Sequence, residues 1–232
     1  MTDSYDYDLV CIGSGPAGQR GAVQAAKLGR RVAIVERRTT LGGICVATGT
    51  IPSKTFREAV VSLTNPGLTA TMGKPAIRPT AQQLLARVDE LVGREGSVIG
   101  NQLSRNGVDV FCGDASFVDP HRIRISAFDG WREITTANAL IACGTRAMPP
   151  SGVASDGEAI ITSDDIGQLK RLPKSLAVIG AGVIGIEYAS MFAALGVEVT
   201  VVDKRDRPLE FIDAEIVDEL IHQMRKRNVS FR

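Results

Sequence analysis

One pattern of a strand, a glycine-rich turn, a helix and a second strand occurs twice in this 232-residue chain. The first copy runs from Leu9 to Glu36 and the second from Leu176 to Asp203, so every landmark is displaced by 167 positions. The turns read Gly-Ser-Gly-Pro-Ala-Gly at 13–18 and Gly-Ala-Gly-Val-Ile-Gly at 180–185. Each copy ends its second strand on an acid. The repeat predicts two Rossmann-like α/β domains.

Each glycine of this pattern has a physical role. The first permits a tight turn, the second lets backbone amides approach a pyrophosphate, and the third lets the helix pack closely on the strand. Unpaired N–H groups and about half a positive elementary charge at the helix N-terminus hold the phosphates. The acid can accept hydrogen bonds from a ribose diol. Two such units predict two dinucleotides, a tightly held flavin and an exchanging nicotinamide, and therefore a redox protein.

We expect each copy to bind its dinucleotide through its turn, the start of its helix and its acid. In the first copy these residues are Gly13, Gly15, Pro16, Ala17, Gly18 and Glu36. In the second copy they are Gly180, Gly182, Val183, Ile184, Gly185 and Asp203.

The charge balance argues against a nucleic-acid or membrane partner. The formal net charge is +1 with 23% charged residues, so no global field draws the chain to phosphate-rich surfaces. Partners are expected to be small molecules. The polar, acidic start at Met1–Asp8 has no signal-peptide character, and no apolar run approaches the roughly 20 residues that span a bilayer. We expect a cytoplasmic protein.

The four cysteines are scattered, with no C-x-x-C pair and only two histidines in the chain. This spacing predicts no metal site. Cys11, Cys112 and Cys143 lie within apolar runs and are expected to be small buried hydrophobes with reduced thiols.

The region between the two copies contains helices and a small sheet. Pro52–Lys54 is typical of a helix start, with the helix running to about Leu63. Thr80–Arg105 has helical spacing, and its glycines could interrupt the helix. Asn65–Pro79 is interpreted as an exposed connection. Val108–Ile125 and Trp131–Ile134 predict an antiparallel meander with turns at 119–120 and 129–130.

A buried parallel strand is expected at Asn138–Cys143. The domains are placed at residues 1–150, for FAD, and 151–232, for NAD(P). The second begins its strand after Pro173, has a last helix at about Ala214–Arg227, and ends in what reads as the start of another strand. A doubly wound domain needs more strands than these, so both domains are expected to be incomplete, with truncation before a C-terminal dimerisation domain.

The segment Gly42–Lys54 resembles the flavin-contacting segment of the pyridine nucleotide-disulfide oxidoreductases. With the two glycine turns and Ala142–Arg146, the resemblance covers nearly the whole chain. In disulfide-reducing members, two cysteines separated by four residues form a redox dithiol. Here the first is Cys45, but the second position is Thr50, whose hydroxyl cannot form a disulfide. Reduction of disulfides by the family mechanism is therefore excluded, unless a cysteine elsewhere takes the place of the second one.

Within the family, Gly49–Lys54 and the segment 180–190 are similar to the soluble, FAD-dependent pyridine nucleotide transhydrogenases of the Si-specific type. The loss of the dithiol suits that chemistry, because a reduced flavin without a sulfur acceptor keeps its electrons until a second nicotinamide binds. The resemblance implies the cofactors FAD, NAD and NADP, and a homodimer for the intact protein.

The resemblance also assigns site residues. It places Lys54 beside the reactive nitrogen of the flavin, paired with Glu187, where the cation stabilises negative charge on the reduced ring. The resemblance implies that Cys45 lines the flavin without taking part in redox chemistry. Thr50 stands where the second cysteine of the dithiol would be. Further cofactor contacts are assigned to Arg37, Gly43, Ala115, Ala142, Gly144, Thr145 and Lys204.

The choice between NAD and NADP stays open on the sequence. Asp203 suits the ribose diol of NAD and would repel the 2′-phosphate of NADP by about 4 kcal/mol at ~4 Å and an effective dielectric near 20, or roughly a thousandfold. Cations follow at once, at Lys204, Arg205 and Arg207, and one of them could neutralise a 2′-phosphate.

Three functions are compatible with these residues. The first is hydride exchange between NADPH and NAD through FAD. The second is a flavin-dependent NAD(P)H oxidase or quinone reductase, in which oxygen or a quinone takes the electrons. The third is a nucleotide-binding fragment that does not turn over.

Overall fold

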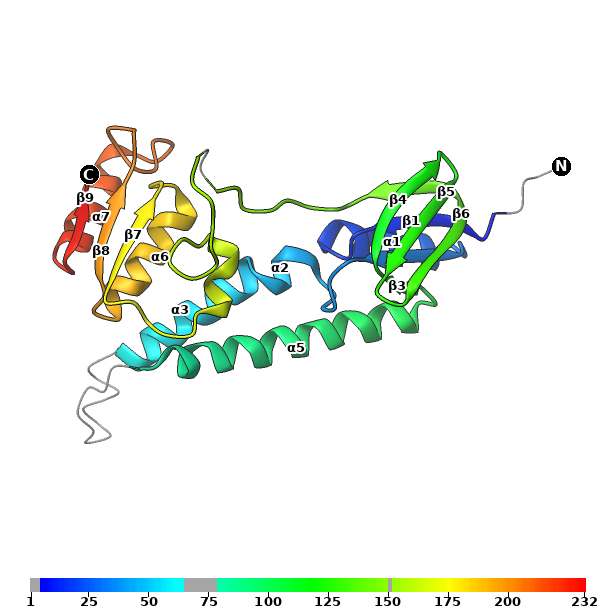
Figure 1. Ribbon diagram of the computed structural model, residues 1–232, viewed down its shortest axis with the longest axis horizontal. Helices are drawn as coiled ribbons and strands as arrows, with labels where there is room; N and C mark the ends of the chain where they lie inside the picture. Colours follow the sequence, from blue (N-terminus) through cyan, green and yellow to red (C-terminus); the bar gives the residue numbers. More distant parts are fainter. Residues whose placement is uncertain (1–4, 65–78, 150–151) are drawn as a thin grey trace. The chain divides into compact units, whose positions relative to one another are not determined.

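A computed structural model describes residues 5–64, 79–149 and 152–232 (Figure 1). The chain forms two compact units, one of Met1–Ser53 with Val88–Asp164 and one of Lys54–Arg87 with Asp165–Arg232. This grouping puts Lys54–Arg87 with the second unit, whereas the sequence-based boundary at residue 150 put it with the first. The assignment of each domain to a nucleotide stays a prediction. Of the expected connection at 65–79, only residue 79 is described.

The first unit is built on a six-stranded sheet in the order β3-β2-β1-β6-β5-β4. Its strands are β1 (Tyr7–Ile12), β2 (Val32–Glu36), β3 (Asp109–Cys112), β4 (Asp114–Asp119), β5 (Arg122–Ala127) and β6 (Gly130–Ile141). β1 pairs in parallel with β2 and β6, and β2 with β3, while β4, β5 and β6 are antiparallel. Helix α1 (Pro16–Lys27) connects β1 to β2, as the first copy of the repeat predicts.

Strand β6 belongs to both parts of this sheet. Its residues Gly130–Thr135 pair antiparallel with β5, and Thr136–Ile141 pair in parallel with β1. The prediction of two separate strands in this stretch is wrong, because the chain stays extended without a turn from Gly130 to Ile141. Ile134, opposite β5, and Thr136, opposite β1, are both buried. The same face of β6 therefore points into the core on both sides of the change of partner strand.

The expected meander at Val108–Ile125 also needs correction. Its first part, β3, joins the parallel sheet beside β2, and only β4 onward is antiparallel. Gly113 separates the two strands with φ +151°, a conformation that L side chains rarely adopt. A Cβ at Gly113 would lie 2.6 Å from the carbonyl oxygen of Ser126, so the chain changes direction where only glycine fits.

Two apolar clusters cover the two faces of the sheet. Cys11 and Ile34 face one cluster with α1 and the long helix α5, whereas Val10 and Val35 face the other with Ile123 of the meander. Neighbouring residues of a strand belong to different clusters because successive side chains point to opposite faces of the sheet. The full clusters also include Ala22, Val32, Val46, Leu103 and Val108 on the first face, and Ala33, Ile125 and Ile134 on the second.

The described residues between β2 and β3 form three helices: α2 (Gly43–Ala47), α3 (Thr50–Thr64) and α5 (Ala81–Arg105). α2 was not predicted, and α3 begins two residues before the expected start. α5 runs without a break through its glycines, contrary to the expected interruption. A glycine weakens a helix without having to end it, and Gly96 is packed closely, since a Cβ there would lie 3.1 Å from Cγ2 of Thr40.

The cysteines are buried less than predicted. Cys11 is fully buried, and burial raises the pKa of its thiol to about 11. Cys112 and Cys143 are exposed, so their assignment as buried hydrophobes is wrong. Cys112 ends β3 at the edge of the sheet, and Cys143 lies beyond the end of β6.

The second unit contains a three-stranded parallel sheet in the order β7-β8-β9. Its elements are the short 3-10 helix at Ser163–Gln168, β7 (Ser175–Ile179), α6 (Val183–Ala194), β8 (Glu198–Val202), α7 (Ala214–Arg225) and β9 (Val229–Phe231). The strand expected at the end of the sequence is confirmed, and α7 ends two residues earlier than predicted. No helix in the described parts of the chain combines the length and the apolar character needed to cross a membrane.

Helix α6 is apolar over most of its surface and is packed within this unit. Tyr188 and Phe192 are both buried. The ring of Phe56, from α3, lies 6.4 Å from the ring of Tyr188 and 5.9 Å from that of Phe192, centroid to centroid. This aromatic cluster holds α3 against α6 from Lys54 onward.

Candidate functional site

The first glycine turn has the geometry of an anion site. Gly13 has φ +105°, and Gly15 precedes α1 in an extended conformation, with φ −61° and ψ 177°. A Cβ at Gly18 would lie 1.9 Å from the carbonyl oxygen of Gly13, which explains the third glycine. A Cβ at Gly15 would meet no described atom within 4 Å, so this glycine faces open space. No side chain of the described residues caps α1, and its N–H groups are left for a ligand.

The second turn repeats this geometry. Gly180 has φ +104°, and Gly182 precedes α6 with φ −77° and ψ −178°. A Cβ at Gly185 would lie 2.0 Å from the carbonyl oxygen of Gly180, whereas one at Gly182 would meet no described atom within 4 Å. Val183 and Ile184, which begin α6, are exposed. Two segments 167 residues apart therefore form turns of the same geometry, each with its middle glycine facing open space.

The acid of the first copy is buried and fully engaged with its own turn. Oε2 of Glu36 accepts hydrogen bonds from the Ser14 N–H at 2.9 Å and the Ser14 hydroxyl at 2.7 Å, and Oε1 accepts one from the Arg38 N–H at 3.0 Å. Burial alone would raise the pKa of Glu36. The hydrogen bonds from Ser14 and Arg38 outweigh it and lower the pKa below its ordinary value.

The acid of the second copy holds the equivalent backbone positions. Asp203 accepts hydrogen bonds from the Ala181 N–H at 2.6 Å and from the Arg205 N–H at 2.9 Å. Its remaining donors come from the guanidinium of Arg205, whose Nη2 is 2.6 Å from Oδ2. The Arg205 side chain, followed by these backbone hydrogen bonds, lowers the pKa of Asp203 far below its usual range.

A pocket of about 470 Å³ in the first unit gathers most of the expected flavin contacts. Its volume is within the range of small-molecule sites. The predicted residues that line it are Gly13, Gly15, Pro16, Ala17, Glu36, Arg37, Gly43, Ala115, Ala142, Gly144 and Thr145. Gly18 lies behind the turn, packed on Gly13, and Cys45 is half-buried in α2 without lining this pocket.

Sequence reasoning missed several residues of this pocket. Arg38 and Arg146 add cationic side chains to Arg37, and Cys143 adds an exposed thiol. Arg38 could have been found from its position two residues after the acid, where it also caps the Glu36 carboxylate. The other missed residues that line the pocket are Ile12, Val35, Ile44, Gly113 and Asp114.

The predicted pair of Lys54 and Glu187 forms within the second unit. Nζ of Lys54 lies 2.5 Å from Oε1 of Glu187. The lysine side chain is 60% exposed and the glutamate side chain 20% exposed. Glu187 is one turn into α6 from Val183, so the pair connects α3 to the start of the helix that follows the second glycine turn.

Thr50 and Lys54 share one face of α3, because residues four apart in a helix are neighbours. Thr50 is the first residue of α3 and is exposed, and its carbonyl oxygen accepts a hydrogen bond from the Ser53 hydroxyl at 3.4 Å. Helices α2 and α3 are joined by a tight turn, in which the Gly49 N–H donates a hydrogen bond to the Ile44 carbonyl oxygen at 2.6 Å.

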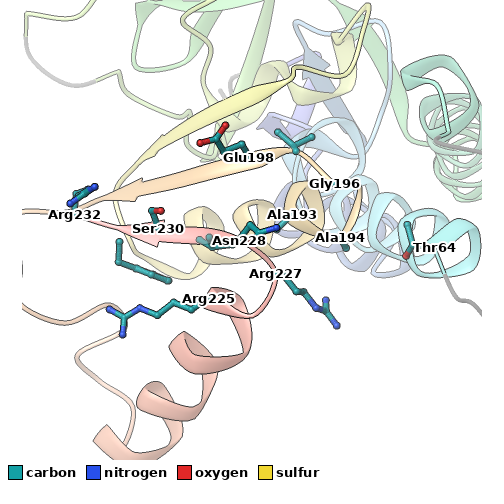
Figure 2. A pocket seen from close by; sticks show the side chains of 13 residues that line it. Thr64, Ala193, Ala194, Gly196, Glu198, Arg225, Arg227, Asn228, Ser230 and Arg232 are labelled. Atoms are coloured by element: carbon teal, nitrogen blue, oxygen red, sulfur yellow. The ribbon is translucent and has the colours of Figure 1, made fainter.

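A larger cavity, of about 1120 Å³, lies elsewhere in the second unit (Figure 2). It is bordered by the ends of α6 and α7 and by β9, with Arg225, Arg227 and Arg232 among its lining residues. None of its lining residues belongs to the second glycine turn or to Asp203. The larger cavity is therefore separate from the residues predicted to bind the second dinucleotide. Among the described residues, no cluster of His, Cys, Asp and Glu could hold a metal ion.

A fold with two Rossmann-like units, each with an open glycine turn held by an acid, defines a class of oxidoreductases that bind FAD and NAD(P). The chain belongs to the pyridine nucleotide-disulphide oxidoreductase family, which matches residues 7–232.

Several relatives of the chain are named soluble pyridine nucleotide transhydrogenase. The chain is 52% identical over 233 residues to that of Mycobacterium bovis (strain BCG / Pasteur 1173P2), covering 98% of this chain and 50% of the relative. It is 40% identical to that of Azotobacter vinelandii (strain DJ / ATCC BAA-1303), covering 98% and 50%. The chain thus spans about half the length of the relatives it matches.

A solved structure has the same fold. The Cu(II) complex of the HOCl-induced flavoprotein disulfide reductase RclA from Escherichia coli matches with a TM-score of 0.84 at 29% identity, covering 99% of this chain and 49% of that one.

Proposed function

We propose that the protein is an FAD-dependent oxidoreductase that passes hydride between NADPH and NAD without a redox disulfide. The observation that carries this proposal is the pair of equivalent open turns at Gly15 and Gly182, each beside an acid that fixes the turn. Two turns of one geometry support two dinucleotides. The similarity to soluble transhydrogenases supports the choice of FAD for the first and NAD(P) for the second.

The first unit is suited to the adenosine diphosphate part of FAD. The N–H groups at the start of α1 would hold the pyrophosphate, and Gly15 leaves room for its approach. Arg37, Arg38 and Arg146 supply positive charge around the same pocket. This donor set fits a long dianionic ligand.

When bound, FAD supplies a reversible acceptor for a hydride. Lys54 is proposed to stabilise the negative charge of the reduced state, with Glu187 holding the lysine side chain in place. Thr50 presents a hydroxyl where disulfide-reducing relatives have a thiol, so electrons are retained for a second nicotinamide. Cys45 is proposed to be a lining residue without redox work.

The test is transhydrogenation by the FAD-loaded protein, measured as NADPH-dependent reduction of thio-NAD⁺ with no quinone or disulfide present. We expect sustained turnover in the wild type and a strong reduction in a Thr50→Cys variant, whose thiol creates an alternative acceptor with Cys45. Ser62→Cys, which places a thiol at an exposed position of α3, is the matched control and should keep wild-type turnover.

Other outcomes discriminate the alternatives. Bleaching of the flavin by NADPH without thio-NAD⁺ reduction, followed by reoxidation on adding a quinone or oxygen, would replace this proposal with a quinone reductase or oxidase. Failure to retain flavin absorbance after incubation with FAD and gel filtration would overturn the assignment of the first unit.

A further inference from the structure

In both copies of the repeat, the chain returns to the glycine turn six residues after the acid. In the first copy, the Gly42 N–H donates a hydrogen bond to the hydroxyl oxygen of Ser14 at 2.9 Å. In the second copy, the equivalent Leu209 N–H donates to the carbonyl oxygen of Ala181 at 3.3 Å. Gly42 has φ +114° and Leu209 has φ +52°, so both returns use a positive φ. The first copy therefore makes this contact through a side chain and the second through the backbone.

The Ser14 hydroxyl is the centre of a buried chain of hydrogen bonds. It accepts one from Gly42 and donates one to Oε2 of Glu36 at 2.7 Å. Ser14 is 0% exposed and Glu36 is 6% exposed. The Ser14 N–H also donates to Oε2 of Glu36, at 2.9 Å. The backbone of residue 14 is thus held on the acid by its own N–H, and the hydroxyl has the separate role of connecting the acid to Gly42.

The contact with Ser14 fixes the place at which α2 begins. Gly42 precedes α2, and a Cβ at Gly42 would lie 2.3 Å from Cγ2 of Val46. A Cβ at Gly43 would lie 2.8 Å from Cα of Gly15, in the middle of the glycine turn. Because the first residues of α2 are packed this closely on the turn, a small shift of Gly42 would move the whole of this short helix.

Helix α2 connects Gly42 to the segment that is predicted to face the flavin. Cys45 lies within α2. Thr50 follows α2 after a tight turn, in which the Gly49 N–H donates to the Ile44 carbonyl oxygen at 2.6 Å. All of these residues belong to the first unit, and Ile44 lines the pocket beside the first glycine turn. A path of hydrogen bonds and one short helix therefore leads from the acid to Cys45 and Thr50.

Glu36 keeps capacity for a ligand while it holds Ser14. Its Oε2 accepts both Ser14 donors, and its Oε1 accepts the Arg38 N–H at 3.0 Å. An ionised carboxylate offers about four lone-pair sites. Within the described parts of the chain, one site on Oε1 is therefore left over. One carboxylate has room for a ribose hydroxyl on Oε1 and for the Ser14 hydroxyl on Oε2.

We propose that Ser14 is a positioning residue that couples binding of the adenosine diphosphate part of FAD to the placement of α2 and Thr50, an inference that rests on the proposed FAD function of the first copy. A ligand on Oε1 orders the carboxylate of Glu36, and Oε2 holds the hydroxyl that holds Gly42. Without the hydroxyl, the N–H of residue 14 still holds the turn, but the buried Gly42 N–H loses its acceptor. The turn then keeps its shape while α2 loosens.

The test compares binding of FAD with binding of 5′-ADP, which is part of FAD, by isothermal titration calorimetry on the protein freed of FAD. In Ser14→Ala, 5′-ADP should bind within about threefold of wild type, whereas FAD should bind about 10- to 100-fold more weakly. Thr136→Val is the matched control. Its hydroxyl is equally buried and donates to the Asn138 carbonyl oxygen at 2.6 Å, away from α2, so its loss should leave the ratio of the two affinities at the wild-type value.

Hydrogen exchange of the FAD-free protein gives a readout that needs no ligand. In Ser14→Ala, peptides that cover residues 42–49 should exchange faster than in wild type, while peptides from α1 should not. Ser14→Thr keeps a hydroxyl on the same carbon and should return both the exchange and the affinity ratio toward wild type. Ser14→Cys keeps the buried volume but offers only a weak thiol donor, so it should behave like Ser14→Ala without leaving a cavity.

The remaining outcomes would each overturn one proposal. Equal weakening of FAD and 5′-ADP in Ser14→Ala and Ser14→Cys would show that Ser14 only shapes the turn, and it would overturn the coupling. Wild-type exchange at residues 42–49 in these variants would overturn it as well. Failure of the wild-type protein to bind either FAD or 5′-ADP would instead overturn the proposed FAD site itself.

Discussion

The hydroxyl of Ser14 joins Glu36 to the loop that precedes α2. It donates to Oε2 of Glu36 at 2.7 Å, and its oxygen accepts a hydrogen bond from the Gly42 N–H at 2.9 Å. Both side chains are buried. Glu36 is therefore a structural clamp on the glycine turn as well as the acid expected to meet a ribose. Glu36 also lines the pocket beside the first glycine turn, so the clamp is part of the pocket wall.

The Glu36 clamp should make stability depend on pH. Because the folded pKa of Glu36 is lowered, its contribution to the free energy of unfolding is present above the unfolded value, 4.5, and is lost as the pH falls through the folded pKa. We expect Glu36→Gln to lower the melting temperature at pH 7. In more acidic buffer, the difference in melting temperature between this variant and wild type should become smaller. Thermal melts from about pH 7 down to about pH 3 measure this.

The exposed Glu90 of α5 supplies the control for that series. Glu90→Gln should follow the wild-type pH curve throughout. A constant difference between Glu36→Gln and wild type at every pH would show that the charge of Glu36 plays no part in the clamp.

The two kinds of glycine in the first turn should respond differently to a methyl group. Gly15→Ala is expected to melt within a few degrees of wild type, since φ −61° suits alanine and its Cβ meets open space. The methyl should nevertheless weaken FAD binding at least about tenfold, because it occupies the path of the pyrophosphate. Gly18→Ala should cost roughly 1–3 kcal/mol of stability or more through collision with Gly13.

Calorimetric melts and FAD titrations separate these effects. Equal destabilisation by Gly15→Ala and Gly18→Ala would contradict the assignment of Gly15 to the ligand side of the turn.

The ion pair of Lys54 and Glu187 should matter more for redox chemistry than for folding. A pair with a 60% exposed lysine contributes at most about 1 kcal/mol to stability. Lys54→Met should therefore melt near wild type, while the flavin becomes harder to reduce and turnover falls roughly 100-fold. Spectroelectrochemical titration reports the first effect and the transhydrogenation assay the second.

Lys27→Met, at an exposed lysine of α1, is the control for loss of charge. A double charge reversal, Lys54→Glu with Glu187→Lys, should restore the pair but not the turnover. Recovery of turnover in this double variant would show that Lys54 acts only as a structural partner of Glu187.

The exposed cysteines allow a test of whether FAD binds in the pocket proposed for it. Cys112 and Cys143 should react readily with iodoacetamide, whereas Cys11, buried and with a pKa of about 11, should not. Because Cys143 lines the pocket and Cys112 does not, FAD should protect only Cys143. Peptide mass spectrometry reads out both sites in one sample. Equal protection of both cysteines would mean that FAD binds elsewhere or that it stabilises the whole protein against opening.

The repeat was predictable because its determinants are local. The positive φ at Gly13 and Gly180, and the collisions that require Gly18 and Gly185, involve residues a few positions apart. The dual role of β6 was not predictable, because it depends on which strands lie beside it. Cys112 and Cys143 were misplaced for the same reason, since an apolar run does not reveal where the edge of a sheet lies.

The ion pairs of the acids were not predictable from the sequence either. The sequence placed three cations after Asp203 but could not say which of them holds it. That depends on Ala181, 22 residues earlier, which lacks the hydroxyl that Ser14 gives to Glu36. The Lys54–Glu187 pair joins residues 133 positions apart, and only the resemblance to a family predicted it.

The twelve residues of β6 couple the local unfolding of the two halves of its sheet. One half of the strand holds the meander and the other holds β1, so the meander cannot detach without pulling on the strand that ends at the glycine turn. We therefore expect the meander and the pocket at the first glycine turn to open as one cooperative unit. A substitution far out on the meander should then speed the release of a ligand from this pocket without changing the contacts of the bound ligand.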